Sequence, residues 1–269
     1  MQQQSILAAV DLGSNSFRLQ IARVEGEQLY MLDSLREPVR LAAGLGEDKQ
    51  LSKDAQLRAL ACLQRFGERL RGLPQKAVRA VGTNSLRVAK NAPEFLQQAE
   101  AALGFPIEVI AGREEARLIY MGVAQGLPQS DKRRMVMDIG GGSTEFIIGK
   151  GLEPIRLESL YMGCVSYTQR FFPDGKITKA ALKQAELAAR NELQTIASEF
   201  AFGHWESALG SSGSARVLCD LLEQNGYSAS GITRGGLEQL RAQLLKAGEA
   251  EKLELQGLKP DRIPVLPGG

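Results

Sequence analysis

The sequence is poor in histidine and cysteine, and each shortage argues against a class of protein. His204 is the only histidine, and the three cysteines, Cys62, Cys164 and Cys219, lie far apart without a CxxC spacing. A Ser-His-Asp hydrolase needs a histidine as its base, and zinc sites and disulfide frameworks need clustered ligands or paired cysteines. We therefore expect none of these, and expect Cys164 to be a core residue.

Excess charge of one sign and long apolar runs are also missing. The formal net charge is +2, so the chain has no overall basic field and we expect no nucleic-acid partner. The sequence contains no run of about 20 apolar residues and no signal-peptide pattern at its start, so we expect no membrane partner. The three scattered cysteines instead lead us to expect a reducing, cytoplasmic location. Any anionic ligand must therefore be bound by local groups.

What the sequence does contain is one glycine-rich motif in two copies. DLGSNSF occupies residues 11–17 and DIGGGST occupies residues 138–144. Their alignment pairs Asp11 with Asp138 and Gly13 with Gly140, and the flanking apolar stretches align as well. Such a repeated unit predicts two similar lobes, which we place at residues 1–127 and 128–269.

Apolar alternation and helix-capping residues predict the same α/β pattern in both copies. The first copy has expected strands at 6–11, 17–24, 29–35, 77–81 and 107–110, with helices at 52–71, 93–103 and 114–125. The second has expected strands at 135–138, 145–149 and 152–160 and helices from 165 and 178. Residues 263–266 correspond to the strand at 107–110, and no counterpart of the next helix follows, so we expect a second lobe truncated at its C-terminal end.

The two glycine-rich turns are candidate phosphate sites. Small residues let a phosphate approach the main chain, and successive backbone N–H groups in a tight turn form an anion-binding nest. The candidate residues are Gly13, Ser14, Asn15 and Ser16 in the first turn and Gly141, Gly142, Ser143 and Thr144 in the second. An ordinary glycine hairpin turn is the alternative for either copy alone, but duplication with matching acids favours phosphate binding.

A further small-residue loop follows a later strand in each copy. In the second copy, Ser212 and Gly213 precede a helix, whose N-terminus attracts anions; a plain serine helix cap is the alternative. In the first copy, Thr83 lies in the corresponding loop, just before Arg87. A guanidinium can bind two phosphate oxygens at once, which makes Arg87 a candidate ligand, with a solvated helix residue as the alternative.

Several carboxylates lie where they would meet a bound phosphate. Asp11 and Asp138 end strands at the glycine turns and would repel it unless a cation such as Mg²⁺ intervenes. Glu145 is a further candidate metal ligand or water-positioning group, with a solvated strand residue as the alternative. Glu114 and Glu115 begin a helix after a strand end, and one of them is a candidate to orient an attacking water. Adjacent helical side chains diverge, so we expect the other on the surface.

These motifs, taken in order, resemble a known family. The chain contains VDLGSNSFRLQIARV, VGTNSLR, AGREEARLIYMGV, DIGGGSTEFIIG, MGCVSYTQRFF and VLPGG, and over essentially its whole length it resembles the exopolyphosphatase and guanosine-pentaphosphate phosphatase family. The resemblance implies two ribonuclease-H-like lobes of the actin, heat-shock ATPase and sugar kinase superfamily, each with a mixed β-sheet and flanking helices. It also implies Glu115 as the catalytic base, Arg87 on the phosphate under attack, and Asp138 and Glu145 at the metal.

The reaction that the resemblance implies is hydrolysis of the terminal phosphoanhydride of inorganic polyphosphate, which releases orthophosphate and uses Mg²⁺. Guanosine pentaphosphate is the alternative substrate, because the same motifs serve both activities. An actin-like or kinase-like ATPase and a non-catalytic polyphosphate-binding fragment are further alternatives. Longer family members carry an additional helical domain that contributes to dimerisation, so a homodimer is expected for the full-length protein.

Overall fold

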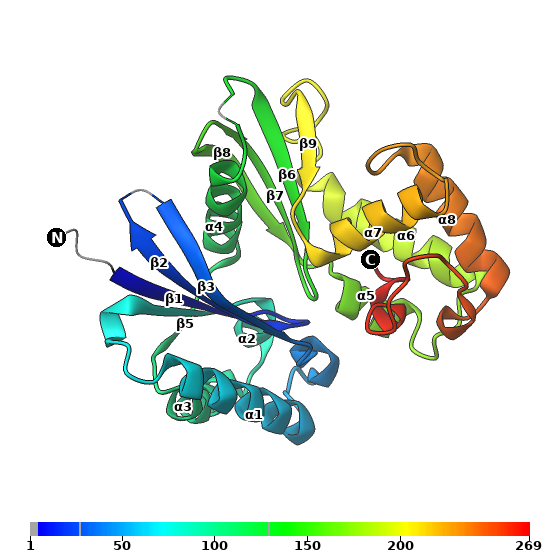
Figure 1. Ribbon diagram of the computed structural model, residues 1–269. Helices are drawn as coiled ribbons and strands as arrows, with labels where there is room; N and C mark the ends of the chain where they lie inside the picture. The colour runs from blue at the N-terminus through cyan, green and yellow to red at the C-terminus, as the bar shows by residue number, and fades with distance from the viewer. Residues whose placement is uncertain (1–4, 27, 129) are drawn as a thin grey trace. The chain divides into compact units, whose positions relative to one another are not determined.

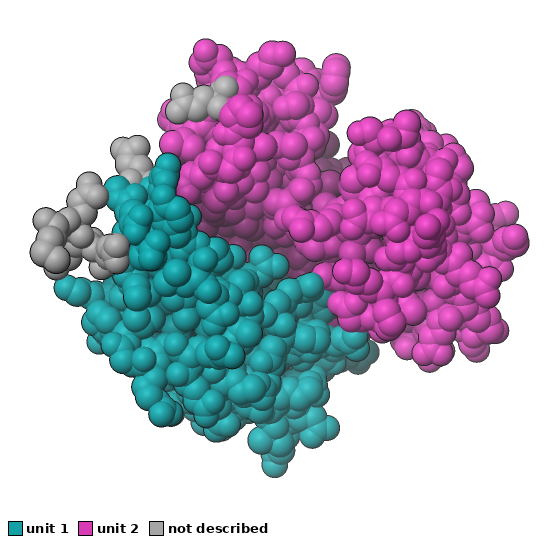
Figure 2. Space-filling model, in the orientation of Figure 1, with its two compact units in different colours: residues 1–111 teal, residues 112–269 magenta. Residues whose placement is uncertain are grey.

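The computed structural model describes residues 5–26, 28–128 and 130–269. The chain divides into two compact units, Met1–Ala111 and Gly112–Gly269 (Figure 2). We call them unit 1 and unit 2. Each unit contains its own β-sheet and its own buried core.

Unit 1 is built on a five-stranded mixed sheet of order β3-β2-β1-β4-β5 (Figure 1). Strands β1, β2 and β3 are antiparallel neighbours, whereas β4 runs parallel to β1 and β5 runs parallel to β4. The strands are β1 (Ser5–Leu12), β2 (Phe17–Glu25), β3 (Gln28–Glu37), β4 (Val78–Gly82) and β5 (Ile107–Val109). The strands predicted for the first copy are therefore confirmed.

Helices α1 (Lys53–Leu70) and α3 (Ala92–Leu103) cover one face of this sheet, and the short helix α2 (Asn84–Val88) follows β4 (Figure 1). Helix α1 begins where the sequence predicts, because the Ser52 hydroxyl accepts a hydrogen bond from the Ala55 N–H and so satisfies a donor of the first turn. The core of unit 1 includes the fully buried side chains of Leu12, Phe17, Leu63, Phe66 and Phe95.

Unit 2 repeats the same sheet with four strands in the order β8-β7-β6-β9. Strands β6, β7 and β8 are antiparallel neighbours, and β9 runs parallel to β6, just as β4 runs parallel to β1. The strands are β6 (Arg133–Ile139), β7 (Thr144–Lys150), β8 (Glu153–Leu160) and β9 (Ser207–Gly210). The predicted duplication of a mixed sheet is confirmed.

Strand β7 is buried on both faces. Ile147 packs with Tyr120 of helix α4 (Gly112–Gln125), whereas Phe146 and Ile148 belong to a separate apolar cluster on the opposite face. Successive strand residues point to opposite faces, so an unbroken run of apolar residues indicates a strand covered on both sides. Any polar side chain at the start of this strand is therefore enclosed by protein.

The boundary between the units follows from the packing of α4. This helix packs on the sheet of unit 2, so the chain passes from unit 1 to unit 2 between Ala111 and Gly112. The sequence repeat suggests a later boundary, between residues 127 and 128. The motif repeat starts with a strand in each copy, whereas the packing unit includes the helix that precedes the second copy.

Four helices complete unit 2: α5 (Cys164–Phe171), α6 (Lys179–Gln194), α7 (Gly213–Gln224) and α8 (Arg234–Ala247). Their core contains Tyr167, Phe172, Leu221, Leu222 and Leu240. Cys164 is buried as predicted, and burial raises the pKa of its thiol. No helix within the described ranges has the length and apolarity needed to cross a membrane.

The prediction of a strand at 263–266 is wrong. This segment begins with a 3₁₀ helix, Ile263–Val265, and Leu266 continues in a helical conformation. Pro264 lies in its first turn, where a missing N–H costs nothing and the fixed φ of proline fits. The apolar residues suggested a strand, but a proline cannot donate to a strand ladder.

Candidate functional site

The turns that join β1 to β2 and β6 to β7 have the same shape. A Cβ atom on Gly13 would lie 2.8 Å from the Ser16 carbonyl oxygen, and one on Gly140 would lie 2.9 Å from the Ser143 carbonyl oxygen. Both distances are too short for a real side chain. The two copies therefore need glycine at this position for the same steric reason.

In unit 1 the carbonyl groups of the turn accept hydrogen bonds from the segment that follows β3. The Ser14 oxygen accepts from the Ala42 N–H at 2.9 Å, and the Asn15 oxygen accepts from the Arg40 N–H at 2.8 Å. Carbonyl oxygens repel anions, so their occupation by protein donors suits a turn whose N–H groups serve a phosphate.

In unit 2 the start of helix α5 takes the same role. The Gly140 oxygen accepts from the Cys164 N–H at 2.9 Å, and the Gly141 oxygen accepts from the N–H groups of Val165 and Ser166 at 2.9 and 3.1 Å. The first N–H groups of a helix have no partner within the helix. The glycine turn thus supplies those partners and is held in place by them.

The structure brings the predicted loop of unit 1 against its glycine turn. The Ser14 hydroxyl accepts from both the N–H and the hydroxyl of Ser85, at 3.2 and 2.8 Å, and the Thr83 hydroxyl donates to the backbone at the end of β1. Arg87, in α2, donates through Nη1 to the Ile110 carbonyl oxygen at 3.0 Å. The glycine turn is therefore hydrogen-bonded to the loop that contains Thr83, and Arg87 follows this loop in the short helix α2.

The two turns differ in the charge of the residue opposite the aspartate that they share. In unit 1 Asp11 pairs across the strands with Arg18, whereas in unit 2 Asp138 pairs with Glu145. Both pairs occupy the same register position. Unit 2 therefore places two carboxylates beside its turn where unit 1 places one carboxylate and one guanidinium.

Glu145 is almost completely buried, with 1% of its surface exposed. Burial raises the pKa of Glu145 to about 8, and the negative charges of Glu115 and Asp138 act in the same direction, while hydrogen bonds from Ser143 and Ser159 oppose the shift. The Ser159 hydroxyl donates to Oε1 of Glu145 at 2.8 Å. A nearby cation favours the charged form of a carboxyl group, so this cluster of acids fits a cation.

The structure separates the two adjacent acids at the start of α4. Glu114 accepts two hydrogen bonds from the Arg117 guanidinium, at 2.8 and 2.7 Å, on the helix surface. The charge of Glu115 acts on Glu145 instead. As adjacent helical positions require, the two side chains face different surroundings, and of the two it is the charge of Glu115 that contributes to the raised pKa of Glu145.

The small-residue loop between β9 and α7 touches the same cluster. The Ser211 hydroxyl donates to Oδ2 of Asp138 at 2.5 Å. Ser212 is the N-cap of α7, and its hydroxyl accepts from the Ala215 N–H at 3.0 Å. The helix-cap alternative for Ser212 is therefore confirmed, and its role in phosphate binding stays a prediction.

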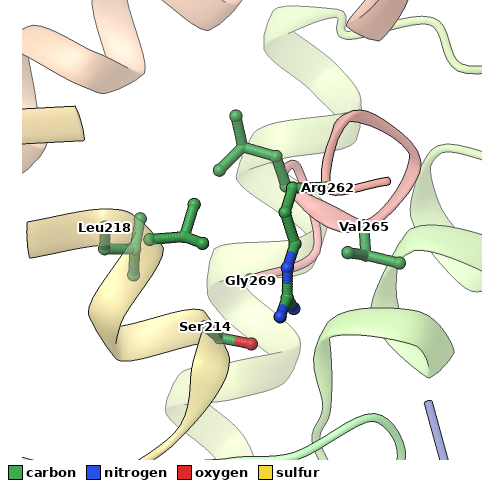
Figure 3. Close-up of a pocket in the computed structure, with 7 residues that line it drawn as sticks. Ser214, Leu218, Arg262, Val265 and Gly269 are labelled. Atoms are coloured by element: carbon green, nitrogen blue, oxygen red, sulfur yellow. The ribbon is translucent and has the colours of Figure 1, made fainter. Parts of the chain in front are cut away.

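Sequence reasoning missed Arg262, which is 7% exposed. A Cβ atom on Gly213 would lie 2.8 Å from Nη2 of Arg262, so the guanidinium packs directly against the start of α7. Figure 3 shows it pointing toward Ser214 in a small pocket, and its Nε lies 3.6 Å from Oδ2 of Asp261. The burial of Arg262 has no local sequence signal, because the adjoining apolar segment was expected to be a strand.

The side chains near the second turn fit a magnesium ion better than an enclosed metal. Among the residues that the structure describes, no group of three or more His, Cys, Asp or Glu side chains is placed to hold a metal. Structural zinc and calcium sites need more protein ligands than two carboxylates supply. Mg²⁺ instead keeps several waters and takes one or two carboxylates plus substrate phosphates, which fits Asp138 and Glu145.

The fold and these loops define an α/β protein in which a mixed β-sheet with flanking helices is repeated in two units. An exopolyphosphatase from Cytophaga hutchinsonii has the same fold, with a TM-score of 0.85 and 24% identity over 98% of this chain and 87% of that one. A chain of a PilM–PilN type IV pilus biogenesis complex matches at a TM-score of 0.50 and 14% identity, covering 97% of this chain and 98% of that one.

The family follows from two further comparisons. A Ppx-GppA enzyme from Aquifex aeolicus is 27% identical with a TM-score of 0.76, covering 99% of this chain and 90% of that one. The model of the Ppx/GppA phosphatase family matches residues 20–269. The chain belongs to the Ppx/GppA phosphatase family.

Proposed function

We propose that this phosphatase-family chain hydrolyses the terminal phosphoanhydride of inorganic polyphosphate with the help of Mg²⁺. The observation that carries the proposal is the buried carboxyl of Glu145, held near Glu115 and Asp138 at the edge of a phosphate-type turn. A buried carboxyl whose charged form is further disfavoured by two negative charges is costly to ionise without a cation. A polyanionic substrate that arrives with Mg²⁺ supplies that cation.

In unit 2 the acids have different roles in this proposal. Asp138 and Glu145 hold Mg²⁺, which when bound neutralises phosphate oxygens and so lowers the cost of charge in the transition state. Glu115 accepts the proton of the attacking water, because it is the acid of α4 whose charge acts on Glu145. The N–H groups of Gly141 and Gly142 bind phosphate oxygens, since the turn carbonyls are bonded to α5.

In unit 1, Arg87 and the turn at Gly13–Ser16 bind the phosphate. Phosphoryl transfer depends mainly on positioning and on stabilising charge over the equatorial oxygens. The bond from Arg87 to the Ile110 carbonyl fixes one side of the guanidinium, which lowers the entropy cost of orienting it. A covalent nucleophile is not required.

Guanosine pentaphosphate is the second candidate substrate, favoured by the double description of the family as Ppx/GppA. Both substrates end in a phosphoanhydride, so the same residues would serve. Release of orthophosphate from long-chain polyphosphate and from guanosine pentaphosphate, measured side by side with Mg²⁺ and with EDTA, separates them. We expect faster release from polyphosphate and loss of activity in EDTA.

The role of Glu115 has a matched control in its neighbour. Glu115→Gln is expected to lower kcat by about 10²- to 10⁴-fold, the usual contribution of a general base. Glu114→Gln alters an adjacent carboxyl that pairs with Arg117 on the surface, so its kcat is expected to stay near that of the parent protein. Equal rates for Glu115→Gln and the parent, at equal folded fraction, would show that another group activates the water.

A further inference from the structure

Glu145 lies between Asp138 on strand β6 and Ser159 on strand β8. Its neighbour on β8 is therefore a serine and not another acid. Strand pairing between β7 and β8 begins with Lys150 opposite Glu153, and counting outward from this pair would place Glu158 opposite Glu145. A bulge between Ile148 and Gly149 shifts the register by one residue, so that Ser159 takes this position. Like charges directly opposite each other destabilise a strand pair, and the bulge avoids that arrangement.

The bulge is held by the packing of α4. A Cβ atom on Gly149 would lie 2.2 Å from Cζ of Tyr120, so the backbone approaches the tyrosine ring more closely than any other residue would allow. Glu158, displaced by the same shift, forms an ion pair with Arg113 at 2.7 Å. The helix, the bulge and this ion pair together fix Ser159 against Glu145.

Asp138 has an equivalent hydroxyl partner from a different element. The Ser211 N–H donates to the Met137 carbonyl oxygen at 3.0 Å, which fixes the loop backbone beside β6. From there its hydroxyl donates to Oδ2 of Asp138 at 2.5 Å. The carboxyl groups of Glu145 and Asp138 thus each accept a hydrogen bond from a serine. Strand pairing fixes the backbone of Ser159, and a hydrogen bond to β6 fixes the backbone of Ser211.

We propose that Ser159 and Ser211 are positioning residues, which hold the carboxylates of Glu145 and Asp138 in the orientation that binds Mg²⁺. This inference rests on the proposed function, because it takes these acids as the metal ligands. A hydroxyl bonded to a carboxylate forms a short, charge-assisted hydrogen bond. It fixes a side chain that would otherwise lose rotamer freedom when the metal binds, and such outer partners commonly affect metal affinity.

The test is metal binding to the substrate-free protein. We expect Ser159→Ala and Ser211→Ala each to weaken Mn²⁺ binding, measured by electron paramagnetic resonance, by about 10- to 100-fold, the usual effect of removing an outer partner. Ser159→Thr and Ser211→Thr keep a hydroxyl and are expected to restore most of the affinity. Ser228→Ala removes a serine hydroxyl that bonds to the Ser230 carbonyl and should leave binding unchanged.

Thermal unfolding of each variant checks that the fold is intact. Mn²⁺ affinity equal to that of the parent in folded Ser159→Ala and Ser211→Ala would overturn the inference, as would an equal loss in the threonine variants. Absence of Mn²⁺ binding in the parent would overturn it together with the metal role in the proposed function. If the parent binds Mn²⁺ and the alanine variants weaken it, but no phosphate is released from polyphosphate, the inference stands and the proposed reaction fails.

Discussion

The side chain of Glu145 lowers the stability of the folded protein when its carboxyl group is ionised. Its carboxyl is buried at the start of a strand that is covered on both faces, near two other acids. A buried carboxyl is far easier to keep neutral than charged. The native state of the metal-free protein therefore retains a proton that the unfolded chain releases.

This difference predicts a pH-dependent stability. The pKa of Glu145 is about 8 in the native state, against an ordinary value of 4.5. The stability contributed by the neutral carboxyl is fully present below pH 4.5 and is lost as pH rises toward 8, because only the unfolded chain has ionised in that range. In EDTA, Glu145→Gln is expected to gain on the order of 4 kcal/mol relative to the parent between pH 4.5 and pH 8.5.

Urea unfolding of both proteins at the two pH values measures that gain. A difference between parent and variant that is the same at both pH values would contradict the assignment of a neutral buried carboxyl. Excess Mg²⁺ is expected to narrow the gap at pH 8.5, since a ligand that binds only the native state stabilises it.

Residue positions were predictable where motif and secondary structure agree, and not where packing decides, and the roles assigned to the site residues stay predictions. The sequence indicates that the two adjacent acids in α4 face different surroundings, and in the structure Glu114 pairs with Arg117 whereas the charge of Glu115 acts on Glu145. Ser159 was missed because its place opposite Glu145 depends on a bulge. A bulge set by contact between Gly149 and a distant tyrosine leaves no local signal.

At the scale of elements, the second glycine turn packs closely against the start of α5. Gly163, the N-cap of α5, has extended backbone angles that any residue can adopt. A Cβ atom there would lie 2.4 Å from the Gly141 carbonyl carbon and 2.5 Å from the Gly142 nitrogen. The glycine is therefore required by space and not by backbone conformation.

Gly163→Ala is expected to push α5 away from the turn and to weaken the hydrogen bonds that join them. Overpacking of this kind costs about 1–3 kcal/mol, and phosphate release should fall with it because the turn loses its support. Gly235→Ala is the control: it lies in α8 with no atom within 4 Å of the added Cβ, and alanine favours the helix by up to about 1 kcal/mol.

Chemical denaturation of both variants gives the comparison. The two glycines are expected to respond with opposite sign, Gly163→Ala losing stability and Gly235→Ala keeping or gaining it. Similar stabilities for Gly163→Ala and the parent would show that α5 and the turn can separate freely.

Most helices and strands could be predicted from local sequence patterns. Short apolar stretches next to glycine turns identified most strands of both sheets, and capping residues marked the starts of α1 and α6, where Ser52 and Thr178 accept the expected hydrogen bonds. The segment 263–266 failed because a short apolar run with one proline has no periodicity to separate a strand from a 3₁₀ helix. Such runs depend on the tertiary packing that surrounds them.

For the whole molecule, the division after Ala111 predicts which N-terminal fragment folds by itself. Unit 1 has its own core within residues 1–111, whereas α4 buries Tyr120 and Ala124 against the strands of unit 2. A fragment of residues 1–111 is therefore expected to fold, and a fragment of residues 1–127 to carry a helix with an exposed apolar face.

Circular dichroism and dye binding distinguish the two fragments. The shorter one should unfold cooperatively with little binding of a hydrophobic dye, and the longer one should bind more dye and aggregate at lower concentration. A cooperative transition in the longer fragment alone would place α4 with unit 1 and support the boundary suggested by the repeat.

The difference between Arg18 and Glu145, which lie opposite the corresponding aspartates of the two copies, has an evolutionary consequence. Because the two turns keep the same glycine and the same strand register, changing this one cross-strand partner reverses the local charge without altering the backbone. A gene that has doubled such a unit can specialise its copies through side chains alone, and both copies continue to fold while their chemistry diverges.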